Sequence, residues 1–283
     1  MPVLQILSDL HLESPQAYDI FQIPPKAPYL ALLGDIGYAI KHEGEYYNFL
    51  RQQLARFRVV FLVLGNHEPW HSDWDVTRAR MRHFEHVIKR ERENTCNEGA
   101  GNKNNTPGTA LGKFVLLDQT RYDIQEEGDA DVTILGCTLF SRVPLESLDD
   151  VSFGLQDFYK TDDWTVEKHT ARFEEELAWL NAQVSALRSE NRRVVIFTHY
   201  SPTLDKRAVD PKHGTSRIQA GFSTDLRGQL CWESECVKLW AFGHTHFNCD
   251  FVDEKTQKRV LAHQRGYYSH QAKGFDVEKI VEI

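Results

Sequence analysis

The chain has 283 residues, of which 41% are hydrophobic and 26% are charged. These proportions are ordinary for a globular protein with enough apolar surface to bury a core. There are 33 Lys and Arg residues against 41 Asp and Glu residues, which gives a net charge of −8. An acidic chain lacks the general phosphate attraction of polynucleotide-binding proteins, so we expect no polynucleotide partner, whereas small nucleotides remain open.

Further bulk features concern the environment in which the chain works. No run of about 18 apolar residues is present, so we expect no transmembrane helix and no membrane partner. The first residues have no basic segment and too short an apolar run for a signal peptide. The five cysteines are odd in number and form no CxxC pair, which disfavours a disulfide framework or a zinc finger. We therefore predict a cytoplasmic protein and leave its oligomeric state open.

In chain order, five short apolar stretches each end in polar residues. Each stretch predicts a strand that is buried on both faces of a parallel sheet. Open α/β sheets place their chemistry at the carboxyl ends of such strands. The predicted strands and their polar ends are 3–7 before Asp9 and His11, 29–33 before Asp35, 59–63 before Asn66 and His67, 194–197 before His199, and 237–242 before His244 and His246.

Each of these strand ends taken alone is more typical of turn chemistry than of a metal site. Asp9 and His11, two residues apart, have the chemistry to face one metal together. Asn66 offers a neutral carbonyl oxygen as a ligand, and the His67 imidazole can stabilise or protonate an oxyanion. Five such ends in one chain favour a shared site over five independent turns.

The segments between these strands predict helices, further strands and two loops of unusual composition. Apolar residues at helical spacing predict helices over 46–57, 73–92 and 166–187. The residues rich in Asn and Gly over 94–109 predict a mobile surface insertion. Further strands are expected over 114–117 and 132–135, with an acidic turn at 126–129 between them, and a closing hairpin is expected with arms 247–252 and 258–262.

The segment 138–164 is rich in aromatic residues and shows no clear periodicity. It is interpreted either as a lid or binding loop, which would bring Phe158 and Tyr159 to the substrate, or as a local packing cluster. Trp70 follows His67 by three residues and is expected at the mouth of the site, where it could stack on a base. The alternative for Trp70 is packing beneath the following helix.

The ordered strand ends, with Gly65-Asn66-His67-Glu68 and Gly243-His244-Thr245-His246, resemble the calcineurin-like metallophosphoesterase superfamily. The resemblance covers Asp9 to His246. It implies an α/β fold, a four-layer α/β/β/α metallophosphoesterase sandwich with a dinuclear site at the C-terminal strand ends, as one domain over 1–283. The implied ligands are Asp9, His11, Asp35 and His246 for the first metal, and Asp35, Asn66, His199 and His244 for the second.

The resemblance also implies a chemistry. Two divalent or trivalent ions, Mn, Fe or Zn, would share the Asp35 carboxylate as a bridge. A water between them would lose its proton and attack the phosphorus of a small phosphoester, while His67 stabilises or protonates the leaving oxygen. A non-catalytic scaffold with the same fold is the alternative from another class. It is disfavoured because all seven ligand positions and His67 are intact.

The chain departs from one branch of the superfamily in a way that bears on the substrate. Protein Ser/Thr phosphatases follow the second-strand Asp with Asp-Arg-Gly and place Arg before Gly-Asn-His-Glu. Here Asp35 is followed by Ile36-Gly37-Tyr38, and Leu64 precedes Gly65. Without these phosphate-gripping arginines, a phosphodiesterase acting on small nucleotides is favoured, with a phosphomonoesterase, including a protein phosphatase, as the alternative. The arginines that could restore a clamp from a loop are Arg142, Arg207 and Arg217.

Overall fold

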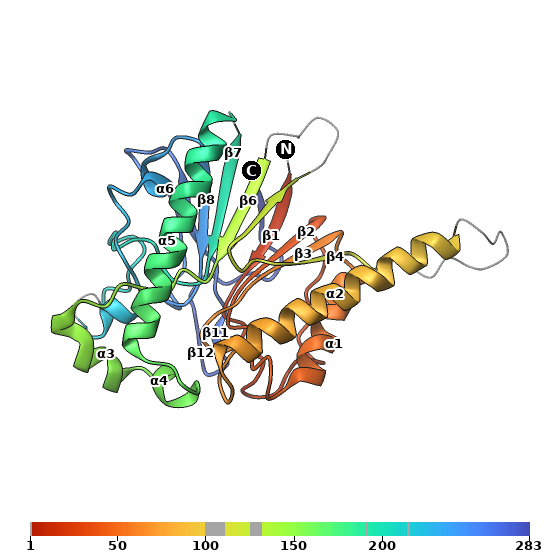
Figure 1. Cartoon of the computed structure of the whole chain (residues 1–283), viewed down its shortest axis with the longest axis horizontal. Coiled ribbons are helices and arrows are strands. Elements are labelled where there is room, and N and C mark those ends of the chain that lie inside the picture. Colours follow the sequence, from red (N-terminus) through yellow and green to blue (C-terminus); the bar gives the residue numbers. More distant parts are fainter. Residues whose placement is uncertain (1, 100–110, 125–131, 191, 214–215) are drawn as a thin grey trace.

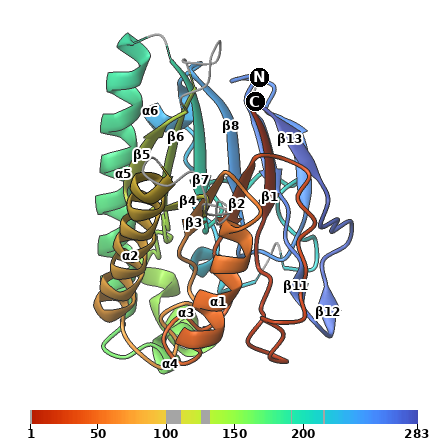
Figure 2. The ribbon, with the colours of Figure 1, turned by 90° about the vertical axis from the view of Figure 1, so that its right-hand side faces the viewer.

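Two β-sheets lie against each other in the middle of the molecule, and helices cover their outer faces (Figure 1). The computed structural model describes residues 2–99, 111–124, 132–190, 192–213 and 216–283, with only the backbone for 96–99. The strand order is β13-β1-β2-β3-β4 in the first sheet and β5-β6-β7-β8-β10-β9 in the second. Helices α1 and α2 flank the first sheet and α5 flanks the second, as Figure 2 shows from the side. The predicted four-layer sandwich is confirmed.

The elements have the following bounds. The first sheet contains β1 (Val3–Leu7), β2 (Tyr29–Leu33), β3 (Val59–Val63), β4 (Lys113–Leu116) and β13 (Ile280–Glu282). The second contains β5 (Thr120–Asp123), β6 (Val132–Cys137), β7 (Arg193–Thr198), β8 (Val237–Phe242), β9 (Cys249–Val252) and β10 (Arg259–Ala262). A small hairpin pairs β11 (Gly266–Tyr267) with β12 (His270–Gln271). The helices are α1 (Glu43–Leu54), α2 (Trp74–Gly99), α3 (Leu148–Gly154), α4 (Asp157–Lys160), α5 (Val166–Ser189) and α6 (Leu230–Glu233), with 3₁₀ turns at η1 (Leu145–Ser147) and η2 (Gln219–Gly221).

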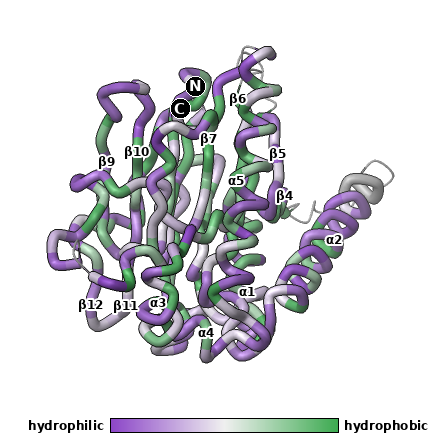
Figure 3. The backbone as a smooth tube through the Cα atoms, turned by 60° about the vertical axis from the view of Figure 1, so that its left-hand side comes forward, coloured by the Kyte–Doolittle hydropathy of each residue, from purple (hydrophilic) through white to green (hydrophobic). Residues whose placement is uncertain are grey.

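The central strands are apolar throughout because both of their faces are covered. Along β3, Phe61 packs between the two sheets, whereas Leu62 packs toward the helices. In the second sheet, Phe197 faces the first sheet and Ile196 faces the helical layer. Strands β6 and β7 accordingly consist mainly of hydrophobic residues, while hydrophilic residues dominate α2 (Figure 3). A strand covered on both faces needs an uninterrupted apolar run, as observed.

Several predicted boundaries are wrong. Helix α2 continues through residues 94–99, the beginning of the predicted insertion, and 100–110 lie outside the described residues. Asn lowers helix stability by only a fraction of a kcal/mol, so it does not end a helix that is already formed. Helix α1 begins three residues earlier than the predicted 46–57 and ends at Leu54.

The predicted strands at 114–117 and 132–135 belong to different sheets. Strand β4 pairs with β3, whereas β6 pairs with β5, a strand that was not predicted from the sequence. The expected turn at 126–129 lies outside the described residues. The closing hairpin is confirmed as β9 and β10, and β10 also pairs in parallel with β8. Among the described helices, none combines the length and apolar character needed to cross a bilayer.

Candidate active site

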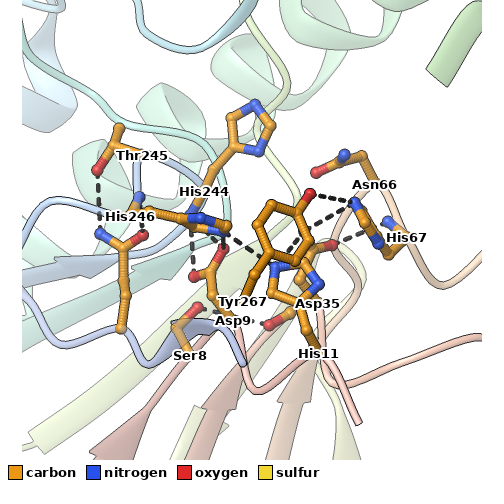
Figure 4. Close-up of polar contacts among 12 residues, drawn as sticks. Ser8, Asp9, His11, Asp35, Asn66, His67, His244, Thr245, His246 and Tyr267 are labelled. Carbon is orange, nitrogen blue, oxygen red and sulfur yellow. Dashed lines mark hydrogen bonds and ion pairs between the residues drawn. The ribbon is translucent and has the colours of Figure 1, made fainter. Parts of the chain in front are cut away.

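The polar ends of five parallel strands meet at one edge of the two sheets. Asp9, Asp35 and Asn66 follow β1, β2 and β3 of the first sheet, and Figure 4 shows them beside His244, which follows β8. His199 follows β7, the parallel neighbour of β8 in the second sheet. All five side chains are buried. Both sheets therefore contribute to a single site.

The backbone at this edge adopts a conformation that residues other than Gly rarely take. Five of the predicted site residues have φ values between 46° and 69°. Each such residue costs about 1–3 kcal/mol, and such strain is concentrated at functional sites. The five are Asp9, His11, Asp35, His244 and His246.

Two glycines allow the main chain to approach these side chains closely. A Cβ atom at Gly65 would collide with the Asp35 carboxylate. A Cβ atom at Gly243 would lie 2.6 Å from Asp9 Oδ2. The glycines of the two motifs thus leave room for the carboxylates of the neighbouring strand ends.

Two groups of potential metal ligands share the Asp35 carboxylate. In the first, His246 Nε2 lies 3.2 Å from Asp9 Oδ1 and 2.9 Å from His11 Nε2. Asp35 Oδ2 lies 3.8 Å from His11 Nε2, whereas Asp35 Oδ1 lies 3.5 Å from His199 Nε2. One oxygen of Asp35 therefore faces each group, as a carboxylate that bridges two cations requires.

The second group consists of Asp35, His199, His244 and Asn66. Ligand atoms of the first three lie within 4.8 Å of one another, and Asn66 Oδ1 lies 2.9 Å from His199 Nε2. Because His199 Nδ1 donates to the Leu33 carbonyl oxygen at 2.8 Å, Nε2 of the neutral ring presents a lone pair. Two lone pairs at this separation repel each other, and a cation in contact with both removes the repulsion. This donor set fits a metal ion.

The charge state of the site also fits a cation. Burial lowers the pKa of both His11 and His199 to about 4, so both rings are neutral at pH 7. Neutral imidazole is the form that binds metal. Burial raises the pKa of Asp35, and the nearby carboxylates of Glu68 and Asp9 raise it further. A bound cation would offset this accumulation of buried carboxylates.

Glu68, the last residue of the Gly-Asn-His-Glu motif, joins two of the strand ends. Its Oε2 accepts hydrogen bonds from the backbone N–H groups of Asp35 at 3.0 Å and Gly65 at 2.6 Å. Its Oε1 accepts from the N–H of Ile36 at 2.8 Å and from the Tyr46 hydroxyl at 3.1 Å. Glu68 therefore has a structural role: it holds the turn after β2 against the turn after β3.

Glu13, which was not among the residues predicted from the sequence, holds two imidazoles of the site. Its Oε1 accepts from Nδ1 of His11 at 3.0 Å and from Nδ1 of His67 at 2.9 Å. Both rings then direct Nε2 into the site, as carboxylates behind metal ligands commonly arrange. Burial alone would raise the pKa of Glu13. The hydrogen bonds from the two rings outweigh this effect and hold the pKa below its usual range, so the carboxylate is ionised at pH 7. The spacing Asp9-x-His11-x-Glu13 was the available signal.

Asp157 of α4 orients two of the predicted site residues. Its Oδ1 accepts from Asn66 Nδ2 at 2.8 Å and from Trp70 Nε1 at 3.0 Å. The first bond turns Asn66 Oδ1 toward His199, and the second holds the Trp70 ring, which stacks on His67 with 3.6 Å between ring centroids. No local pattern marks Asp157, because its partners lie about 90 residues away in the chain.

A cavity of about 350 Å³ opens beside the two ligand groups. One wall of the cavity is apolar and consists of Leu155, Ile218 and Phe222. Neutral amides come from Gln156 and Gln219. None of the described residues that line the cavity is Lys or Arg. The strand ends that line it are Asp35, Asn66, His67, His244 and His246.

The three aromatic residues predicted to bind substrate occupy different places. Trp70 lines the cavity and is only 4% exposed. Phe158 packs against the hydrophobic cluster that includes Val151, and Tyr159 is 65% exposed to solvent. Neither lines the cavity, because one turn of α4 directs Asp157 inward and the next residues elsewhere. The segment 138–164 also contains α3 and α4, which its lack of long periodicity concealed.

The two-sheet sandwich gathers carboxylate, amide and imidazole side chains at its strand ends, an arrangement suited to metal-dependent hydrolysis. The family model described as calcineurin-like phosphoesterase matches residues 1–248, and the chain belongs to this family. It is thus a metallophosphoesterase, a metal-dependent phosphoester hydrolase. A search of curated proteins finds no match.

Three solved structures similar to this chain are distant from it in sequence. The phosphopantetheinyl hydrolase from Mycobacterium tuberculosis is 19% identical, with a TM-score of 0.58, over 94% of this chain and 90% of that one. A dimetal phosphatase from Danio rerio is 14% identical, with a TM-score of 0.48, over 93% and 87%. A putative 5'-nucleotidase from Staphylococcus aureus is 13% identical, with a TM-score of 0.48, over 92% and 48%. At 19% identity, the likeness to the phosphopantetheinyl hydrolase extends to the fold alone.

Proposed function

We propose that this protein is a two-metal phosphodiesterase that acts on small phosphodiesters, nucleotides among them. The observation that carries the proposal is an edge of potential metal ligands beside a cavity whose described lining contains no Lys or Arg. A dianionic phosphomonoester gains more from a cationic clamp than a monoanionic diester does. The neutral amides and apolar wall suit the diester.

The proposed ligands divide between two metals. Asp9, His11, Asp35 and His246 would hold the first, and Asp35, Asn66, His199 and His244 would hold the second. Imidazole and carboxylate donors suit Mn, Fe or Zn. When bound, such ions supply Lewis acidity and lower the pKa of water for attack on phosphorus.

His67 is proposed to handle the proton of the leaving oxygen. Glu13 accepts the hydrogen bond from its Nδ1, so Nε2 is the nitrogen that exchanges a proton with substrate. Nε2 lies 3.8 Å from Asp35 Oδ2, next to the shared ligand. The carboxylate behind the ring stabilises the imidazolium that would donate this proton, although burial lowers the pKa of His67.

The arginines that could have restored a clamp lie elsewhere. Arg207 forms a bidentate pair with Asp205, and Arg142 pairs with Glu174. Arg217 is exposed, with Asp150 as its 3.9 Å partner. None of the three lines the cavity. This supports the diester over the phosphomonoester alternative.

A hydrolysis panel tests the proposal. Purified protein with Mn²⁺ is offered cyclic nucleotides, an aryl phosphodiester, an aryl phosphomonoester and a phosphopantetheinyl ester, the group after which one structural neighbour is named. We expect the highest kcat/KM for a phosphodiester. Faster hydrolysis of monoesters would identify a phosphomonoesterase, and two bound metals without hydrolysis of any ester would favour a scaffold.

An inactive variant provides the control for contaminating activity. Asp35→Asn should abolish hydrolysis and lower the content of both metals, because Asp35 faces both ligand groups. Asp19→Asn, at an exposed position, should behave like the wild type. Hydrolysis that survives in Asp35→Asn would place the activity outside this site.

A further inference from the structure

The β11–β12 hairpin places a tyrosine over the candidate site from the C-terminal part of the chain. The hairpin is fastened to the loop that carries the first ligands: Arg265 N–H donates to the Ser8 carbonyl, and Gly266 N–H donates to the Asp9 carbonyl, both at 3.0 Å. Tyr267 follows directly. Its position is therefore coupled to that of the Asp9 strand end, about 260 residues earlier in the chain.

The Tyr267 ring lies among the histidines of the site (Figure 4). Its centroid lies 4.2 Å from that of His11 and 4.8 Å from that of His246. Its hydroxyl oxygen lies 3.3 Å from His67 Nε2, the nitrogen proposed to exchange a proton with substrate. Tyr267 remains partly accessible, since the residue is 40% exposed and lines the cavity.

The hydrogen-bond pattern defines which group donates. His67 Nδ1 donates to Glu13, so Nε2 of the neutral ring accepts and the Tyr267 O–H donates. A tyrosine phenol, with an ordinary pKa of about 10, carries its proton at pH 7 and is a neutral donor. The site thus holds a neutral donor whose present acceptor is the atom that substrate must approach.

We propose that Tyr267 is a catalytic residue whose hydroxyl donates a hydrogen bond to a phosphoryl oxygen of the substrate. This inference rests on the proposed function and specifies how the phosphate is held. A substrate oxygen at this position takes the Tyr267 hydrogen bond and frees the Nε2 lone pair of His67, which would take up a proton from water and pass it to the leaving oxygen. Because the donor is neutral, it binds a phosphoryl oxygen without the added positive charge of an arginine clamp, which suits a monoanionic diester.

The test compares two hydroxyl deletions on the same hairpin. Tyr267→Phe removes the proposed donor and keeps the ring, while Tyr268→Phe is the matched control, because Tyr268 is 64% exposed and outside the cavity lining. Both variants are examined with Mn²⁺ for metal content, melting temperature, kcat and KM on an aryl phosphodiester. The affinity for inorganic phosphate is measured by calorimetry.

We expect Tyr267→Phe to keep both metals and its melting temperature. Its kcat/KM should fall about 10- to 100-fold, and its phosphate affinity about tenfold, the loss of one hydrogen bond to a charged oxygen. Tyr268→Phe should match the wild type in every measurement.

Unchanged kcat/KM and phosphate affinity in Tyr267→Phe would overturn the inference. So would a loss of bound metal, because the hydroxyl would then support the ligands rather than the substrate. If the wild type hydrolyses no ester in the panel, the proposed function fails, and the phosphate affinities of the two variants still decide whether Tyr267 contacts a phosphoryl group.

Discussion

At the scale of single residues, Glu13 acts on two functions of the site through one oxygen. Its Oε1 accepts from both His11, a proposed metal ligand, and His67, the proposed proton donor. Its Oε2 has no hydrogen-bond partner among the described residues. A change at Glu13 should therefore affect metal affinity and turnover together, in contrast to a change at either histidine alone.

We expect Glu13→Gln to lower the affinity for the first metal and kcat by about 10- to 100-fold each, because the rings lose the carboxylate that orients them. Calorimetric titration with Mn²⁺ and steady-state kinetics measure the two effects. Glu45→Gln, an exposed change of the same type, is the control. Wild-type metal affinity in Glu13→Gln would show that His11 is held without Glu13.

At the scale of secondary-structure elements, α4 connects the segment 138–164 to the ligand loops. Asp157→Ala leaves Asn66 Nδ2 and Trp70 Nε1 without their acceptor. Each buried donor left unpaired costs about 1–3 kcal/mol. We expect a lower melting temperature and a loss of affinity for the second metal of about 10- to 100-fold.

The control for this prediction is Asp162→Ala, at an exposed position in the same segment. Metal titration followed by thermal unfolding separates the two effects, because stability can be measured without metal. If Asp157→Ala binds both metals as tightly as the wild type, Asn66 takes its orientation from the backbone instead.

Helix α5 carries a buried histidine that makes stability depend on pH. Burial lowers the pKa of His169 to about 3, and its Nδ1 has no partner among the described residues. The unfolded chain, with a His pKa near 6.5, binds a proton that the native state excludes, so the contribution of His169 to stability is lost as pH falls below about 6.5. By pH 5 this loss reaches about 2 kcal/mol.

His169→Gln removes the titrating group, and we expect its stability to fall less steeply between pH 7 and pH 5. The free energy of unfolding is measured in urea at several pH values in this range. His86→Gln, an exposed change on α2, should retain the wild-type slope. Parallel curves for wild type and His169→Gln would contradict a neutral His169 in the native state.

At the scale of the whole molecule, the proposed metals connect the two sheets. Asp9, Asp35 and Asn66 extend from the first sheet, while His199 and His244 extend from the second. Metal binding should therefore stabilise the sandwich as a unit. At a free concentration of 100 times its Kd, one metal adds about 2.7 kcal/mol, a rise in melting temperature of about 4–5 °C.

Calorimetry with added Mn²⁺ and with EDTA measures this rise. Asp35→Asn should show only a small rise in melting temperature with Mn²⁺, because each proposed metal loses one carboxylate ligand. Asp19→Asn should show the same rise as the wild type. Equal melting temperatures of the wild-type protein with Mn²⁺ and with EDTA would contradict a metal held between the sheets.

The sequence by itself determined the strands that carry the site and the family to which the chain belongs. A strand buried on both faces requires a continuous apolar run, and a polar pair immediately after it lies at its carboxyl end whatever the rest of the fold. Local pattern therefore placed Asp35 and His199 each at the carboxyl end of a strand. That these two ends meet, although their strands lie in different sheets, was implied by the resemblance and is seen in the structure. The two glycine motifs identified the family because the close approach of Gly65 and Gly243 to carboxylates admits few other residues.

Only the tertiary structure decided the contacts that act across long distances in the chain. Asp157 reaches Asn66, and Tyr267 reaches His67, without any local periodicity that connects the partners. Phe158 and Tyr159 lie in a segment with the composition of a binding loop. Because this part of the segment is the helix α4, successive side chains point in different directions, and Asp157 rather than Phe158 or Tyr159 faces the cavity. The physical reason is that a hydrogen bond depends on the position of two atoms in space, whereas a sequence pattern records only the burial and direction of a single element.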